Sequence, residues 1–117
     1  MKNYLAVYIG SEASFEASGW NALSEAERKQ RENAGMQAWG QWVAQHQSAI
    51  VDAGTPLGKT LRISSNGIEG ARNQLTAYTV VRAESHEAAA NMFEGHPHFA
   101  IFPGESIEVM ECLPMPR

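Results

Sequence analysis

Two histidines stand where an imidazole could take part in acid–base chemistry. His96 and His98 flank Pro97, directly after a predicted short helix that Gly95 ends. The negative end of a helix dipole favours imidazolium, so either ring could serve near neutral pH as a general acid, a general base or a polar anchor. The plainer interpretation is that both rings cap backbone carbonyls or face solvent in a loop.

A third histidine, His46, falls on the apolar stripe of a predicted helix, between Val43 and Ile50 and beside two tryptophans. It is either a core histidine with satisfied hydrogen bonds or a base or donor that lines a pocket with aromatic walls. We therefore take His98, His96 and His46 as the catalytic candidates. The residues predicted to contact a ligand are Trp39, Trp42 and Phe99.

The sequence offers no motif for a metal or a cofactor, and we predict neither. It contains no glycine-rich phosphate loop and no nucleophile elbow, and His-Pro-His is not an established ligand spacing. The single cysteine, Cys112, reads as a small core residue of the last strand. It cannot form an internal disulfide, so a cytoplasmic protein is the expectation.

Charge and hydropathy narrow the possible partners. The net charge is −4 and the isoelectric point is about 5.5, which disfavours nucleic acids and anionic membranes. The first apolar run is about five residues long, too short for a signal peptide or a membrane span. The remaining partners are a small-molecule ligand and a second copy of the chain.

Apolar periodicity predicts one domain over residues 1–117, with strands at 4–10, 59–64, 75–84 and 105–113. The first helix begins at a capping box of Ser24 and Glu27 and runs to about Ala53, where Gly54 stops it. The second helix is short and begins after Ser85. Residues 11–23 show no clear period, and residues 65–73 read as a hairpin loop.

This order predicts an α+β, ferredoxin-like βαββαβ fold, with two helices on one face of a four-stranded antiparallel sheet. We expect Leu5, Val7 and Ile9 to face the helices, together with Leu61, Ile63 and Val81. Tyr4, Tyr8 and Tyr78 would then form an apolar patch on the open face, with Val80 and Met110. Because monomers seldom expose such a patch, the prediction is a homodimer closed into an α/β barrel through an isologous interface.

Three segments resemble the YCII-related (DGPF-domain) proteins: Met1-Lys2-x-Tyr4-Leu5-x-x-Tyr8, residues 23–28 and Pro103-Gly104-x-x-Ile107-Glu108-Val109. The resemblance covers most of the chain and implies a dimeric α/β barrel. That group includes monooxygenases, haem proteins and isomerases. The Asp-Gly-Pro-Phe segment is absent here, and residues 65–70 occupy the comparable loop. The His–Asp pair proposed as catalytic in relatives has no residue-by-residue match.

Two functions remain open from the sequence. The first is a protein that binds or transforms a small, largely apolar ligand between helix and sheet, with histidine acid–base chemistry. The second is a non-catalytic dimeric accessory or ligand-sensing module, which predicts no enclosed cavity and histidines with solvated neighbours. Fold alone does not decide between them.

Overall fold

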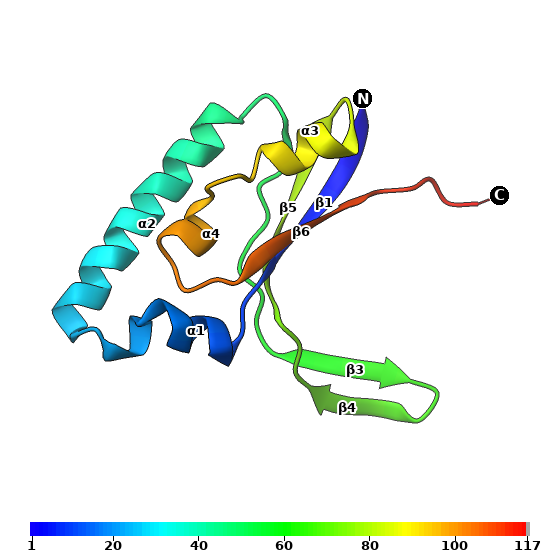
Figure 1. The fold of residues 1–117 in the computed structure, drawn as a ribbon. Coiled ribbons are helices and arrows are strands. Elements are labelled where there is room, and N and C mark those ends of the chain that lie inside the picture. The colour runs from blue at the N-terminus through cyan, green and yellow to red at the C-terminus, as the bar shows by residue number, and fades with distance from the viewer. Residues whose placement is uncertain (117) are drawn as a thin grey trace.

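A computed structural model describes residues 1–116 of the chain (Figure 1). The strands are β1 (Lys2–Ile9), β2 (Ile50–Asp52), β3 (Thr60–Ser64), β4 (Gly67–Ala71), β5 (Leu75–Ala83) and β6 (Ser106–Glu111). The helices are α1 (Glu12–Ser18), the 3-10 turn η1 (Trp20–Ala22), α2 (Glu25–Gln45), α3 (His86–Asn91) and α4 (Pro97–Ala100). None of the helices in this described part is both long and apolar enough to cross a membrane.

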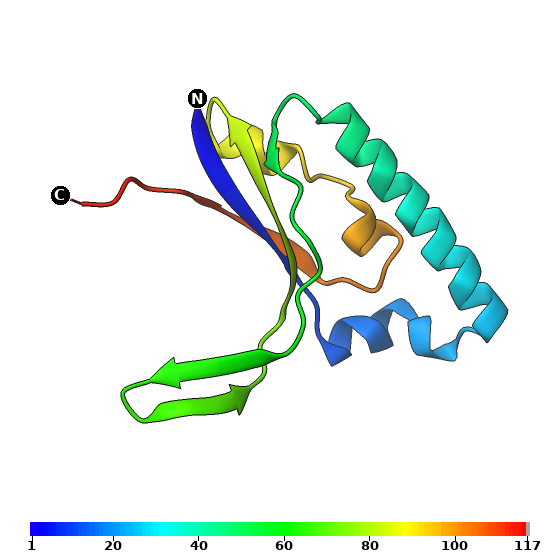
Figure 2. The same cartoon turned by 180° about the vertical axis from the view of Figure 1, so that it is seen from behind.

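The architecture is α+β, with a four-stranded antiparallel sheet and a second, two-stranded sheet. The strand order of the larger sheet is β2-β5-β1-β6, and the smaller sheet is the hairpin β3-β4. All the helices lie on one side of the larger sheet, and the hairpin projects toward the other side (Figures 1 and 2). We call this hairpin the arm.

The two faces of β1 are reversed relative to our expectation. Tyr4, Ala6 and Tyr8 are almost completely buried beneath the helices, whereas Leu5 and Val7 lie half-buried on the open face. Both sets are apolar, so alternation alone could not show which set meets the helices. Aromatic contacts decide it, because Tyr8 packs against Trp39 of α2 at 5.1 Å between ring centroids.

The second strand of the larger sheet is also not the predicted one. Helix α2 ends at Gln45, earlier than Ala53, and residues 46–49 form turns. Ile50 then pairs with Val81 of β5, so residues 50–52 supply the edge strand. Residues 60–64 instead pair with residues 67–71 in the arm, which leaves Leu61 and Ile63 exposed rather than facing the helices.

The segment of residues 11–23 is ordered as α1 and η1, although it shows no sequence period. Short helices of this kind carry too few turns to produce one. Trp20 is buried and packs near Phe102, with 6.2 Å between the ring centroids. Residues 97–100, expected as loop, form α4, because proline fits the first turn of a new helix as well as it ends an old one.

Local capping signals are confirmed. Ser24 and Glu27 form the expected capping box, and the Ser85 hydroxyl accepts from the Ala88 N–H at 3.0 Å. The prediction for Cys112 is wrong. This residue lies just past β6 and is exposed, rather than being a core residue of the last strand.

Candidate functional site

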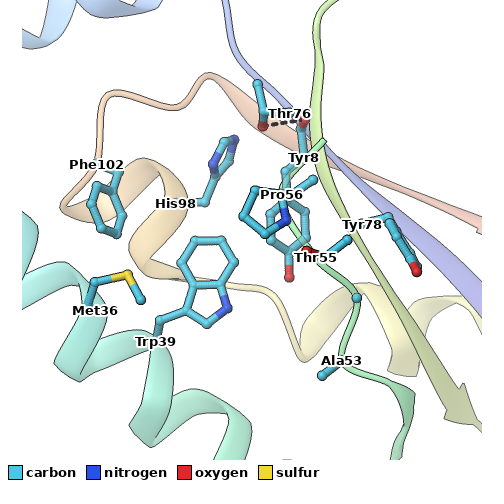
Figure 3. A pocket seen from close by; sticks show the side chains of 12 residues that line it. Tyr8, Met36, Trp39, Ala53, Thr55, Pro56, Thr76, Tyr78, His98 and Phe102 are labelled. Carbon is cyan, nitrogen blue, oxygen red and sulfur yellow. Dashed lines mark hydrogen bonds between the residues drawn. The ribbon is translucent and has the colours of Figure 1, made fainter. Parts of the chain in front are cut away.

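A cavity of about 330 Å³ lies between α2, α4, the end of β1 and the segment that follows β2 (Figure 3). Its walls are mainly apolar, and the sheet forms its floor. The lining residues are Tyr8, Met36, Trp39, Ala53, Gly54, Thr55, Pro56, Thr76, Ala77, Tyr78, His98 and Phe102.

His98 brings an imidazole to the wall of this cavity. It is the second residue of α4 and is buried, and its Nε2 lies 2.8 Å from the carbonyl oxygen of Ile9. A carbonyl only accepts, so Nε2 carries the proton and the lone pair of neutral His98 is on Nδ1. Burial lowers the pKa of His98, while the backbone carbonyls of Ile9 and Ser106 oppose that shift. The neutral ring is thus the dominant form at pH 7, and Nδ1 is its basic atom.

His96 lies directly behind this wall and holds α4 in place. Its Nδ1 accepts the main-chain N–H of His98 at 3.0 Å, so neutral His96 carries its proton on Nε2. Nε2 has no hydrogen-bond partner within residues 1–116 and is fully buried. Burial, and to a smaller extent the other two nearby histidines, lowers the pKa of His96 to about 4.

An aromatic cage surrounds the His96 ring. Trp39 and Trp42 approach it edge-to-face at 4.5 and 4.8 Å between centroids, and Tyr8 lies at 5.2 Å. Burial among these rings desolvates His96 and so disfavours the charged imidazolium.

The floor of the cavity contains a hydrogen-bond chain with a defined direction. The Thr79 hydroxyl donates to the carbonyl of Ala53 at 3.1 Å, so the Tyr8 hydroxyl must donate to Thr79 at 2.8 Å. Burial raises the pKa of Tyr8, and the bond to Thr79 partly offsets this. Tyr8 is therefore a neutral phenol in the floor.

Two glycines permit the close packing around His98 and Phe102. A Cβ on Gly35 of α2 would overlap the Phe102 ring, and a Cβ on Gly104 would overlap the ring and carbonyl of His98. The glycine at each position is thus required by space rather than by backbone conformation. Together they determine where the two rings stand in the wall.

The structure places the predicted site residues in four different locations. Trp39 and His98 line the cavity, whereas Trp42 and His96 are buried behind it. His46 lies at the C-terminal cap of α2, where its Nδ1–H donates to the carbonyl of Trp42 at 2.9 Å. Phe99 is half-exposed and lines a separate hollow with His86, Phe93 and Val109.

Sequence reasoning missed several lining residues. Tyr8 was assigned to the wrong face, and Phe102 carried no signal of its own beyond its position near His98. Ala53 was predicted to be the end of the long helix, with Gly54 as its stop. Alternation in β5 did reveal that Ala77 and Tyr78 lie on opposite faces, but both reach the cavity at its edge.

The cavity offers no metal site. Within residues 1–116, no group of three or more His, Cys, Asp and Glu side chains could hold a metal ion.

No known family profile matches this sequence, and neither does any curated protein. Among solved structures, the chain is similar to 5-chloro-2-hydroxyhydroquinone dehydrochlorinase (TftG) from Burkholderia phenoliruptrix AC1100, solved in complex with 2,5-dihydroxybenzoquinone. The TM-score is 0.48 with 15% sequence identity, over 92% of this chain and 89% of the other. A likeness at this level does not assign the chain to a family or an activity.

Proposed function

We propose that this cavity binds a small, planar, largely apolar molecule and that Nδ1 of His98 accepts a hydrogen bond or a proton from it. One observation carries the proposal: the neutral imidazole of His98 lies in a mainly apolar wall, with Nε2 committed to the carbonyl of Ile9 at 2.8 Å and Nδ1 left as the acceptor. An apolar pocket with few, fixed polar groups is typical of small-molecule sites.

The size and walls of the cavity support a flat ligand. Its volume of about 330 Å³ is at the lower end of the range for small-molecule pockets. The aromatic rings of Trp39 and Phe102 stand close together, with 6.2 Å between their centroids, and Met36 adds a flexible thioether beside them. A ring-shaped molecule would exchange water contacts for aromatic and thioether contacts.

The chemistry available to His98 is proton transfer. Its lowered pKa keeps Nδ1 unprotonated at neutral pH, as a general base requires. The lining residues include no cysteine, serine or lysine that could act as a nucleophile. A ligand-sensing role without turnover would use the same binding step. A non-catalytic module, however, was expected to have solvated histidines, whereas His96 and His98 are buried.

The binding step can be tested by nuclear magnetic resonance with p-cresol as the probe. The three tryptophans give three indole N–H signals, and only Trp39 lines the cavity. We expect p-cresol to shift the Trp39 signal in a saturable way, while the signals of Trp20 and Trp42 stay nearly constant. Equal shifts of all three signals, or none, would contradict the proposed site.

A matched pair of variants tests the role of His98. His98→Leu removes the acceptor, whereas His98→Gln retains a side-chain acceptor and a donor for Ile9. We expect His98→Leu to weaken p-cresol binding more than toluene binding, and His98→Gln to restore part of the difference. The same indole spectrum shows whether each variant is folded.

We also propose that the chain is a ferredoxin-like, YCII-related protein that forms a homodimer through the open face of its sheet. The strand order β2-β5-β1-β6 supports the first part. The open face carries Leu5, Val7 and Val80, and Met110 is 41% exposed there. A second copy would cover this apolar area.

Charge substitution tests the dimer. Val7→Lys places a charge at the centre of the open face, and Ala44→Lys places one on the exposed side of α2. Light scattering should report a dimer for the wild type and the Ala44 variant, and a monomer for the Val7 variant. A monomeric wild type at micromolar concentration would contradict this proposal.

A further inference from the structure

We infer that the cavity selects a neutral ligand that presents a hydrogen-bond donor to His98, and that it excludes the anionic form of the same molecule. This inference rests on the proposed function and specifies its ligand class. It follows from where the polar hydrogens and the charges of the wall are placed.

Most polar hydrogens of the lining side chains are already committed to the protein. The Tyr8 hydroxyl donates to Thr79 at 2.8 Å, the Thr76 hydroxyl to the carbonyl of Tyr8 at 2.9 Å, and His98 Nε2–H to Ile9. The Tyr78 hydroxyl donates to Asp52 at 3.3 Å. An anionic oxygen beside His98 would therefore face a lone pair on Nδ1 rather than a donor.

The charges near the cavity also disfavour an anion. Its lining contains no lysine and no arginine. The carboxylate of Asp52 stands at the rim, where it accepts the Gly54 N–H at 2.9 Å and the Tyr78 hydroxyl. Moving an anion from water to a mainly apolar wall, beside the lone pair of His98 and without a compensating cation, is costly, so the neutral form is favoured.

Two uncommitted donors do not change this conclusion. The indole N–H of Trp39 and the hydroxyl of Thr55 have no hydrogen-bond partner within the part of the chain that the structure describes. They belong to α2 and to the segment after β2, whereas His98 belongs to α4 (Figure 3). Because they are neutral and lie on other elements than His98, an anion placed beside His98 would still have no countercharge and no donor from that ring.

A phenol that ionises near neutral pH tests this inference with the wild-type protein, so folding of a variant is not at issue. We would measure the dissociation constant of 4-nitrophenol between about pH 6.5 and 9, because burial lowers the pKa of His98 below its ordinary value of 6.5 and the ring is therefore mainly neutral in this range. Phenol, which remains neutral across that range, is the matched control. 4-Nitroanisole has no hydroxyl proton, so the ratio of its dissociation constant to that of neutral 4-nitrophenol measures how much the hydroxyl donor contributes to binding.

We expect the dissociation constant of 4-nitrophenol to rise at least about tenfold as the ligand ionises, while that of phenol stays constant. 4-Nitroanisole should bind about fivefold more weakly than neutral 4-nitrophenol, the equivalent of one hydrogen bond. Equal or tighter binding of the nitrophenolate, with the Trp39 indole signal still shifting, would overturn the charge selection and leave the proposed site standing. Absence of any Trp39 shift with all three compounds would overturn both.

Discussion

The main-chain N–H of His98 donates to Nδ1 of His96 at 3.0 Å, which joins the cavity wall to a fully buried ring. This single bond caps α4, fixes the tautomer of His96 and sets the position from which His98 reaches Ile9. His96 and His98 are therefore close in sequence but differ in their structural roles. His96 positions α4, and His98 is the group that we propose contacts a ligand.

Stability should depend on pH through His96. The folded ring has a pKa of about 4, below the ordinary value of 6.5, so the unfolded chain binds a proton between these values that the folded chain does not. The unfolding free energy should be unaffected above pH 6.5 and fall as the pH drops toward 4, by about 3 kcal/mol in total. Burial of His98 adds in the same direction.

Urea unfolding at several pH values between 5 and 7 would measure this slope, where most carboxylates stay ionised. His96→Asn keeps a capping acceptor but cannot titrate, so its unfolding free energy should vary less with pH than that of the wild type. An unchanged slope in this variant would show that His96 is not the titrating group.

Gly35→Ala should destabilise the protein although alanine is the better helix former. The new Cβ would overlap the Phe102 ring, and overpacking of this kind costs about 1–3 kcal/mol, more than the roughly 1 kcal/mol of helix propensity gained. Gly40→Ala is the matched control in the same helix, because its Cβ would meet nothing within 4 Å. It should stabilise by up to about 1 kcal/mol. Urea unfolding of both variants compares them, and equal effects would contradict the close packing.

Gly104→Ala should reduce ligand binding in the cavity more strongly than it reduces the stability of the fold. Its Cβ would overlap both the ring and the carbonyl of His98, so the ring must move away from Ile9. We expect p-cresol affinity to fall at least about tenfold, with a loss of stability of about 1–3 kcal/mol. Gly58→Ala, whose Cβ would contact nothing, should change neither quantity. Calorimetric titration that finds normal affinity in the Gly104 variant would rule out this arrangement.

The arm should contribute little to the stability of the single chain. Leu61 and Ile63 are 66% and 72% exposed, so replacing both with threonine removes almost no buried apolar surface and keeps a β-branched or strand-compatible residue. The unfolding free energy should change by about 0.5 kcal/mol or less. A larger loss that depends on protein concentration would show instead that the arm packs against a second copy.

How far the sequence predicts this fold depends on how many residues each signal spans. Ser24 with Glu27 and Ser85 marked the two helix starts, because capping is a local interaction within four residues. The edge strand at residues 50–52 is three residues long, too short to show alternation, whereas residues 59–64 alternate well and were predicted to be a strand of the main sheet. Which face of β1 is covered depends on residues far away in the sequence.

The candidate site shows the same division. Trp39 and His98 were identified because helix periodicity and residue type indicated them directly. Tyr8 and Phe102 reach the cavity through tertiary packing that no local pattern encodes. In the sequence, Gly35 and Gly104 are not distinguishable from other helix and turn glycines. Only the structure shows that the rings of Phe102 and His98 pack where a Cβ would lie.

The segment of residues 53–56 gives the cavity one rigid side. Gly54 has a φ of 75° and lies so close to the Tyr78 carbonyl that a Cβ would overlap it, and Pro56 bridges to Ala77 of β5. This side cannot swing outward without breaking the sheet edge. If the proposed function holds, a larger ligand would meet this fixed side of the cavity and, across from it, the flexible side chain of Met36, which is 64% exposed. The thioether of Met36 would then be the part of the cavity wall that adjusts to the size of the ligand, without movement of the main chain.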